Sequence, residues 1–218
     1  ISSAASDVYK RQADFIVSLE RGYGELCDQI AREARAEKVP IIRPETASFL
    51  QTMTAAAAPK AILEVGTAVG YSALLMAQAM PEGCRITTIE KYEKRIPKAK
   101  EHFRLAGMED RITLLEGDAG QILSELSGSF DLVFMDAAKG QYIHWLPDVL
   151  RLLSKGGMLI SDNVLQDDTI LESRFAIERR DRTIHSRMRE YLFQLKNHKD
   201  LITSIVPIGD GVTISIKK

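Results

Sequence analysis

Three oxygen-bearing side chains stand directly after two apolar, strand-like runs. Asp136 follows the run at residues 132–135, and Asp162 and Asn163 follow the run at 158–161. Because ligands of an open parallel sheet bind at the carboxyl ends of its strands, we expect these side chains to converge. Two carboxylates and one amide oxygen form the hard ligand set that suits Mg²⁺, and no neighbouring histidine or cysteine favours zinc. The alternative is that each acid only caps a following helix.

Lys139 lies three residues after Asp136, in the segment Asp136-Ala137-Ala138-Lys139. A partly buried lysine beside a divalent cation can have a lowered pKa and act as a general base. Most lysines are solvated surface groups, however, and the sequence position alone leaves both interpretations open.

Residues 63–72, Leu-Glu-Val-Gly-Thr-Ala-Val-Gly-Tyr-Ser, join a short apolar run to a helix-like run. Glycine in such a turn lets the backbone approach a ligand closely and take positive φ. The spacing of Gly66 and Gly70 is neither the G-x-G-x-x-G of dinucleotide sites nor that of a phosphate loop, which ends in Gly-Lys-Ser/Thr. The turn therefore indicates a cofactor with an adenosine but no phosphates, S-adenosylmethionine (SAM), and disfavours a nicotinamide-dependent oxidoreductase. An ordinary strand–helix turn is the alternative.

Two further acids end strand-like runs. Glu90 lies 20 residues after Gly70, where an acid can accept hydrogen bonds from both ribose hydroxyls of an adenosine. Asp118, in Gly117-Asp118-Ala119, can accept a hydrogen bond from the adenine amino group. Each has a structural alternative: Glu90 as a surface or capping acid, and Asp118 as the cap of the next helix, which is compatible with adenine binding.

The elements that must position these side chains alternate along the chain. Strand-like runs occupy residues 61–65, 85–89, 112–116, 132–135 and 158–161, with helix-like runs at 72–80, 93–106, 119–126 and 142–153 and a turn signal at 155–157. A charged helix is expected at 172–196, before strands at 201–206 and 212–216 joined by a short, turn-rich link that suits an antiparallel hairpin. The pattern predicts an α/β, Rossmann-like fold whose seven-stranded, mostly parallel sheet ends in a C-terminal antiparallel hairpin.

The front of the chain has its own pattern. Apolar residues recur at helical spacing over residues 13–38, interrupted at 21–24, and Pro44 suits the first turn of a helix continuing over 45–57. This segment is expected to pack over the cofactor site or against a second subunit. Residues 1–12 begin with Ile1 and show no clear periodicity, so we expect a non-native or disordered tail there and one domain over 13–218.

Composition narrows the class of protein. The net charge of the 218 residues is −1, so no global basic field indicates nucleic acid or membrane binding. No apolar run reaches the roughly 18 residues of a transmembrane helix. Cys27 and Cys84 form no metal-ligand spacing and no disulfide framework, which favours a reducing, cytoplasmic location.

A local excess of positive charge follows the predicted metal site. The arginines are Arg174, Arg179, Arg180, Arg182, Arg187 and Arg189, against Glu178 and Asp181. They can bind the phosphates of a large substrate, or they can lie on a solvated helix laced with ion pairs. Tyr142 and Trp145 can offer a stacking face near the site, but their helical spacing is equally typical of core residues.

Together these residues resemble the cation-dependent O-methyltransferases, the group that contains catechol and caffeoyl-CoA O-methyltransferases, over residues 39–218. Three segments carry the resemblance: residues 63–72, Met135-Asp136-Ala137-Ala138-Lys139 and Ser161-Asp162-Asn163-Val164. The first is typical of SAM enzymes broadly, whereas the Asp-x-x-Lys and Asp-Asn combination is far more specific to this family. A non-catalytic binding module does not account for that combination.

The resemblance implies a role for each matching residue. It implies Mg²⁺ or another divalent cation on Asp136, Asp162 and Asn163. It implies SAM contacts at Ile42, Gly66, Ser72, Glu90, Asp118, Ala119 and Asp136. Asp136 and Lys139 are the implied catalytic residues, since the metal and Lys139 favour a substrate oxyanion that attacks the SAM methyl group in line. A homodimer with the front helices as contacts is implied as well.

Within the family, the chain looks most like bacterial tRNA 5-hydroxyuridine methyltransferases, particularly at Val39-Pro40-Ile41 and Pro207-Ile208-Gly209-Asp210-Gly211. Animal catechol-type enzymes carry bulky residues where this chain has Ala137 and Ala138, which disfavours tight binding of a small planar substrate. The 5-hydroxyl and 4-keto oxygens of the base can chelate Mg²⁺ as a catechol does, and the arginines can contact phosphates of the tRNA anticodon loop. The alternative, which the net charge of −1 favours, is O-methylation of a small catechol-like or phenolic metabolite.

Overall fold

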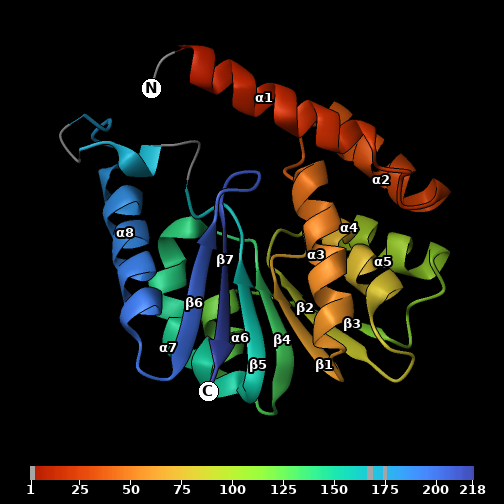
Figure 1. Ribbon diagram of the computed structural model, residues 1–218. Coiled ribbons are helices and arrows are strands. Elements are labelled where there is room, and N and C mark those ends of the chain that lie inside the picture. The colour runs from red at the N-terminus through yellow and green to blue at the C-terminus, as the bar shows by residue number, and fades with distance from the viewer. Residues whose placement is uncertain (1–2, 166–168, 174–175) are drawn as a thin grey trace.

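The computed structural model describes residues 3–165, 169–173 and 176–218. Within these ranges the strands form a 7-stranded sheet in the order β3-β2-β1-β4-β5-β7-β6 (Figure 1). The strands are β1 (Ala61–Val65), β2 (Arg85–Glu90), β3 (Ile112–Glu116), β4 (Phe130–Met135), β5 (Leu153–Ser161), β6 (Leu201–Val206) and β7 (Val212–Lys217). Strands β1 to β5 pair in parallel, whereas β7 runs antiparallel to both β5 and β6. The predicted Rossmann-like sheet with a C-terminal antiparallel hairpin is confirmed.

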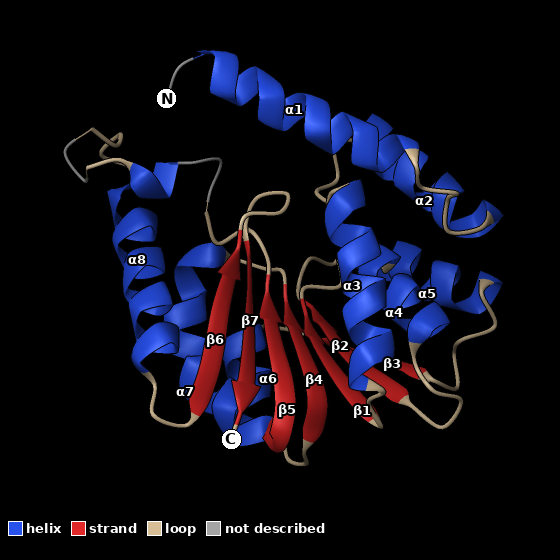
Figure 2. Ribbon diagram, in the orientation of Figure 1, coloured by secondary structure: helices blue, strands red, loops and turns tan. Residues whose placement is uncertain are grey.

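Helices cover both faces of this sheet (Figure 2). On one face lie α3 (Pro44–Ala57), α4 (Tyr71–Ala79) and α5 (Ile96–Leu105), and on the other α6 (Ala119–Glu125), α7 (Tyr142–Leu152) and α8 (Arg182–Asn197). The helices α1 (Ser3–Ser18) and α2 (Glu25–Ala36) lead into α3, and α1 crosses beyond the carboxyl edge of the sheet (Figure 1). Two short 3-10 turns, η1 (Lys139–Gln141) and η2 (Thr169–Leu171), precede α7 and α8.

Both faces of the sheet are apolar because the central strands are buried between the helix layers. Ile62 and Leu63 are adjacent in β1 and point to opposite faces, as successive strand residues must. Ile62 packs in the core formed with α2 to α5, and Leu63 in the core formed with α6 to α8. A mostly apolar run is therefore the expected sequence for β1, in which Glu64 is the one acid, and the glycine turn of the site follows it.

The strand register brings the predicted site residues to one edge. Val65 pairs with Met135 in β4 and with Ile89 in β2, and Met135 pairs with Ser161 in β5. The next residue along each strand is Gly66, Asp136, Glu90 or Asp162. The chain leaves β1 for β2 and β3 on one side and returns as β4 on the other, so this edge is the topological switch point where ligands bind.

The charged helix expected over 172–196 is shorter in the structure. It begins at Arg182 as α8, after separate turns in which Ala176 N–H bonds to the Ser173 carbonyl and Asp181 N–H bonds to the Glu178 carbonyl. The buried face of α8 starts at His185, and the described residues before it are mostly exposed. Since an amphipathic helix depends on packing for most of its stability, the charged stretch alone does not extend it.

The expected non-native or disordered tail over residues 1–12 stays a prediction; in the structure, α1 begins at Ser3. A helix needs no regular apolar stripe where alanine and other helix-compatible residues supply the propensity, as they do at Ala4 and Ala5. The expected interruption at 21–24 is confirmed, since α1 ends at Ser18 and α2 begins at Glu25.

The turn signal at 155–157 falls inside β5 instead of before it. The pairing of β4 with β5 shifts register between Phe130 and Leu132, and Gly156 has a φ of 78°. The glycines therefore mark an irregularity in a longer strand. Across the described part of the chain, no helix has the length and apolar character needed to span a membrane.

Candidate active site at the carboxyl edge of the sheet

The turn after β1 is built so closely against the end of β4 that it excludes a side chain. Gly66 has a φ of 109°, and a Cβ on it would lie 2.0 Å from the carbonyl oxygen of Asp136. The N–H groups of Gly66 and Thr67 both bond to the carbonyl of Ile89 at the end of β2. Glycine is needed at position 66 both for its backbone conformation and for this close approach.

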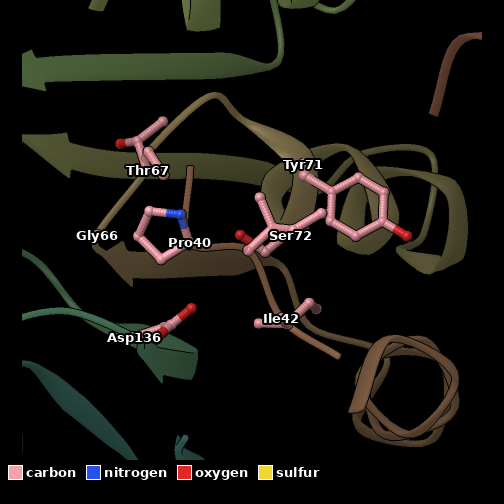
Figure 3. A pocket seen from close by; sticks show the side chains of 9 residues that line it. Pro40, Ile42, Gly66, Thr67, Tyr71, Ser72 and Asp136 are labelled. Carbon is pink, nitrogen blue, oxygen red and sulfur yellow. The ribbon is translucent and has the colours of Figure 1, made fainter. Parts of the chain in front are cut away.

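A small pocket lies between this turn and the segment that leads into α3 (Figure 3). It is lined by Pro40, Ile41, Ile42, Gly66, Thr67, Ala68, Tyr71, Ser72 and Asp136. In Figure 3, Ile42 approaches from the front segment, Ser72 from the start of α4 and Asp136 from the end of β4. The structure thus brings together four of the residues predicted to bind the cofactor.

Glu64 is a buried acid beneath this pocket that the sequence analysis left without a role. Its side chain is fully buried and accepts hydrogen bonds from Ser72 Oγ at 2.5 Å and Thr88 Oγ1 at 2.5 Å. Burial raises the pKa of the Glu64 carboxyl to about 7. A strand residue with its side chain between two helix layers is normally apolar, so the sequence signal for Glu64 was one acid inside an otherwise apolar run.

Glu90 is buried and bound to backbone on both sides of its carboxylate. Oε2 accepts a hydrogen bond from Ala68 N–H at 2.8 Å, and Oε1 accepts from Lys91 N–H at 3.0 Å and Tyr92 N–H at 2.8 Å. Glu90 therefore fixes the glycine turn to the end of β2. Each carboxylate oxygen has two lone pairs, so Oε2 keeps capacity for another donor.

Asp118 caps α6, as its structural interpretation predicted, with Oδ1 accepting from Gly120 N–H at 2.9 Å. Its Oδ2 lies 3.5 Å from Lys91 Nζ, and its side chain is about half exposed. Ala119 is buried at the start of α6. Glu90, Asp118 and Ala119 stand at the ends of β2 and β3, outside the small pocket but along the same edge of the sheet.

The three predicted metal ligands meet in space. Asn163 Nδ2 donates to Asp136 Oδ1 at 3.0 Å and to Asp162 Oδ2 at 3.2 Å, so one amide bridges both acids. Asn163 has a φ of 63°, a left-handed conformation that asparagine tolerates better than most residues. Within the described ranges, no three or more His, Cys, Asp or Glu side chains gather as a metal site. The arrangement is instead two acids and one amide.

This arrangement is short of positive charge. Burial raises the pKa of Asp136 well above that of an ordinary aspartate. The pKa of Asp162 is raised even more, mainly by burial and secondly by the negative charge of Asp136. The Asp162 side chain is 3% exposed, and its Oδ1 has no hydrogen-bond partner among the described residues. A buried acid with an unpartnered oxygen beside a partly buried acid fits a bound divalent cation, because such a cation offsets both the desolvation and the mutual repulsion.

Lys139 and Asp210 are the other charges that act on these acids. Lys139 begins η1, just after Asp136, and its positive charge lowers the pKa of both acids. Asp210 lies in the β6–β7 turn, and its main-chain carbonyl accepts a hydrogen bond from Leu165 N–H in the segment after β5. The negative charge of Asp210 raises the pKa of both Asp136 and Asp162. The sequence analysis used this turn as a hairpin signal and as part of the resemblance to tRNA 5-hydroxyuridine methyltransferases, but gave Asp210 no role at the site.

Tyr142 and Trp145 are core residues of α7, since they are 0% and 8% exposed. The structural interpretation of their spacing is confirmed for these two side chains. Their rings pack at 6.3 Å between centroids, and the ring of Tyr191 in α8 meets Tyr142 edge-on at 5.6 Å.

Several of the arginines after the site contribute to local structure. Arg187 Nη1 donates to the Gly140 carbonyl at 3.1 Å, Arg189 Nη1 to the Ile170 carbonyl at 2.9 Å, and Arg182 Nε to the Ile177 carbonyl at 3.0 Å. Arg180 lies near Glu178 and Asp181, whereas Arg179 is exposed. Arg174 lies outside the described residues. Only part of the predicted positive excess therefore faces solvent as free charge.

Residues 21–218 match the O-methyltransferase family. The chain belongs to that family. Among its relatives, a catechol O-methyltransferase of Niastella koreensis is 34% identical over 135 residues, covering 60% of this chain and 61% of that protein. A caffeoyl-CoA O-methyltransferase of Populus kitakamiensis is 32% identical over 183 residues, covering 76% of this chain and 73% of that protein.

Solved structures share the fold of this O-methyltransferase. A Staphylococcus aureus protein described as a candidate caffeoyl-CoA O-methyltransferase has a TM-score of 0.88 at 27% identity, covering 95% of this chain and 99% of that one. The Podospora anserina methyltransferase PaMTH1, solved with S-adenosylhomocysteine (SAH) bound, has a TM-score of 0.85 at 24% identity, covering 100% of this chain and 97% of that one. The O-methyltransferase fold therefore extends over the whole described chain.

Proposed function

We propose that this O-methyltransferase transfers the methyl group of SAM to a hydroxyl that has a second oxygen beside it on a planar ring, with Mg²⁺ or another divalent cation. The observation that carries the proposal is the bridged pair Asp136 and Asp162, with an unpartnered Asp162 oxygen, next to the pocket under the glycine turn. Residues 13–218 form the proposed methyltransferase domain. SAM supplies the methyl group, which a deprotonated hydroxyl takes in line as the C–S bond breaks.

The proposed SAM site follows the edge of the sheet. Ile42, Gly66, Ser72 and Asp136 line the pocket and would hold the amino-acid end of SAM. Glu64 lies behind Ser72, and the SAM ammonium group near it would favour the charged form of its carboxyl. Glu90 would accept from the ribose, and Asp118 and Ala119 would border the adenine. PaMTH1, which is solved with SAH, has the same fold, which supports an S-adenosyl cofactor for this chain.

The proposed cation site uses Asp136, Asp162 and the amide oxygen of Asn163. In the structure the Asn163 Nδ2 faces both acids, and rotation of the side-chain amide exchanges it with the oxygen. When bound, the cation acts as a Lewis acid that favours the oxyanion of a coordinated hydroxyl. The unpartnered Asp162 oxygen and the raised pKa values of both acids support the assignment.

Lys139 is the proposed general base. It begins the turn η1 directly beyond Asp136, and its charge reaches both acids. Its neutral amine would take the proton of the substrate hydroxyl. Asp136 would then contribute to both sites, bordering the SAM pocket on one side and the cation on the other. This shared residue places the reacting oxygen near the methyl group, and most of the rate enhancement comes from such positioning.

For the substrate we propose 5-hydroxyuridine in the anticodon loop of tRNA, converted to 5-methoxyuridine. Its vicinal 5-hydroxyl and 4-keto oxygens suit the proposed cation site. Ala137 and Ala138 leave the wall beside Asp136 and Lys139 open, and Ala138 is exposed. Arg179 offers an exposed positive charge for a phosphate, although Arg187 and Arg189 bond to carbonyls within the protein.

The second candidate is a small catechol-like or phenolic substrate, which the same cation site would hold. It is favoured by the named catechol and caffeoyl-CoA O-methyltransferases among the relatives and by the net charge of −1. Both candidate substrates would undergo the same methyl transfer to a hydroxyl with a neighbouring oxygen. They differ in size, since one ring belongs to a tRNA and the other to a small molecule.

We also propose a homodimer with the front helices as contacts. The helix α1 exposes Val8, Phe15 and Ile16, and Leu19 just after its end is exposed as well, so that exposed apolar residues recur at helical spacing. Such an apolar stripe is typical of an interaction surface. Sedimentation equilibrium of the intact chain and of a Phe15→Ser, Leu19→Ser variant tests this proposal; a wild-type monomer would contradict it.

One experiment separates the two substrates. Purified protein with SAM and Mg²⁺ is offered tRNA that carries 5-hydroxyuridine, and separately catechol and caffeoyl compounds, and methylated products are quantified by mass spectrometry. Total tRNA from a strain deleted for the gene is analysed in parallel. We expect methylation of the tRNA and loss of 5-methoxyuridine in the deletion strain. Normal 5-methoxyuridine in that strain would reject the tRNA substrate, and methylation of catechols alone would establish the second candidate.

A further inference from the structure

The hydroxyl of Tyr142 lies between the two strand ends that carry the acids. It accepts a hydrogen bond from Ala137 N–H at 3.0 Å and donates to the Met135 carbonyl at 3.1 Å, with the Asp162 carbonyl 3.4 Å away. Met135 and Ala137 are the two neighbours of Asp136 in the chain. One side-chain oxygen thus contacts the peptide groups on both sides of Asp136 and the backbone of Asp162.

These bonds continue the pairing of β4 with β5 beyond its last backbone contact. The register of the two strands ends at Met135 and Ser161, and Asp162 N–H bonds to the Met135 carbonyl at 2.9 Å. Among the described residues, no backbone hydrogen bond joins β4 to β5 past that point, and two acids that repel each other follow. The Asn163 amide bridges the two acidic side chains at this level, and the Tyr142 hydroxyl connects the backbone of the two strand ends.

The ring of Tyr142 is held as firmly as its hydroxyl. Its side chain is 0% exposed, and it packs against Trp145 and edge-on against Tyr191. The Tyr191 hydroxyl in turn lies 2.6 Å from Ser161 Oγ, one residue before Asp162. A ring enclosed in this way leaves its hydroxyl little freedom, so the strand ends it contacts are held at a fixed spacing.

We propose that Tyr142 is a positioning residue that sets the spacing of Asp136 and Asp162 for the divalent cation. The inference rests on the proposed cation role of these two acids. Tyr142 touches neither substrate nor cation in this account; it acts through the backbone of the ligands. Groups that orient metal ligands commonly contribute 10- to 100-fold to metal affinity, so removal of the hydroxyl alone is expected to be measurable.

The test compares Tyr142→Phe with Tyr191→Phe, which loses an equally buried hydroxyl from a residue that does not bond to the backbone of either acid. Mn²⁺ is titrated into each protein saturated with SAH, with calorimetry or electron paramagnetic resonance as the readout. We expect Tyr142→Phe to weaken Mn²⁺ binding by about 10-fold. Tyr191→Phe should stay within about twofold of the wild type, and SAH affinity should change little in either variant. Unchanged Mn²⁺ affinity in Tyr142→Phe, or an equal loss in both variants, would overturn the inference.

Asp162→Asn in the same titration separates this inference from the proposed function. If Asp162→Asn binds Mn²⁺ like the wild type, the proposed cation site is wrong. If Asp162→Asn loses Mn²⁺ binding, the cation site stands, and the result for Tyr142→Phe then tests only whether Tyr142 positions its ligands. Hydrogen exchange of the wild-type protein without metal provides a test that needs no variant. The Ala137 amide should be strongly protected, because it donates to the Tyr142 hydroxyl. Exchange of that amide at the rate of an unstructured peptide would contradict the proposal.

Discussion

Gly66 lies against the main-chain carbonyl of Asp136, so closely that a Cβ on Gly66 would be 2.0 Å from that oxygen. The contact joins the proposed cofactor turn to the first proposed cation ligand. Any change that pushes the turn away from β4 should therefore disturb both sites together.

Gly66→Ala should destabilise the protein and greatly weaken SAM binding. Alanine disfavours a φ of 109°, at a cost of about 1–3 kcal/mol, and its methyl group would displace Asp136. Thermal unfolding and calorimetric SAM titration measure the two effects. Gly83→Ala is the matched control, since a Cβ there meets nothing within 4 Å. Normal SAM affinity in Gly66→Ala would show that the close contact is unimportant for the cofactor.

Glu90→Gln should weaken SAM binding by about 10-fold or more, because the carboxylate holds three backbone N–H groups and hydrogen bonds to a charged acceptor contribute about 1.5–3 kcal/mol. Calorimetric titration with SAM gives the affinity. Glu93→Gln changes a nearby exposed glutamate and should have no effect. A SAM affinity of Glu90→Gln equal to that of the control would remove Glu90 from the cofactor site.

The stability of the metal-free protein should fall as pH rises from about 4.5 to 7, in part because of Glu64. Burial raises the pKa of this carboxyl from 4.5 to about 7 in the folded state. The folded protein therefore holds a proton that the unfolded chain releases, so the stabilising contribution is complete below pH 4.5 and is lost as pH rises through 7. One such group changes the free energy of unfolding by at most about 1.4 kcal/mol per pH unit.

Urea unfolding at a series of pH values measures this slope. Glu64→Gln should flatten it without abolishing it, because Asp136 and Asp162 have raised pKa values too. The same slope in Glu64→Gln and wild type would mean that Glu64 does not titrate in this range.

Arg179→Gln should raise the KM for tRNA several-fold and leave methylation of a small phenolic compound unchanged, because phosphate contacts add affinity without base recognition. Lys155→Gln, another exposed cation, lies at the opposite edge of the sheet and serves as the control. Equal tRNA kinetics for the two variants would show that Arg179 contacts no phosphate.

The fold and most of the site were predictable from sequence for a shared physical reason. The strands that lead to Gly66, Asp136 and Asp162 are largely buried where they approach the site, so each ends in a mostly apolar run just before its site residue. Parallel pairing then forces these ends to one edge.

Other features depend on tertiary contacts that leave no local pattern. Burial of the Glu64 carboxyl under the pocket and the bridging hydroxyl of Tyr142 require knowledge of what packs around them. The start of α8 at Arg182 was missed because the charged residues before it match a helical pattern without an apolar face. The position of Asp210 near the two acids follows from how the hairpin turn folds back onto the segment after β5.

We propose that Asp136, Asp162 and Asn163 hold a divalent cation beside the SAM pocket. Anomalous diffraction from crystals grown with SAH and Mn²⁺ tests it most directly. The account predicts one strong anomalous peak within coordination distance of both carboxylates and the Asn163 amide oxygen, lost in Asp162→Asn. A map without a peak there at saturating Mn²⁺, or with the peak on other side chains, would contradict the account.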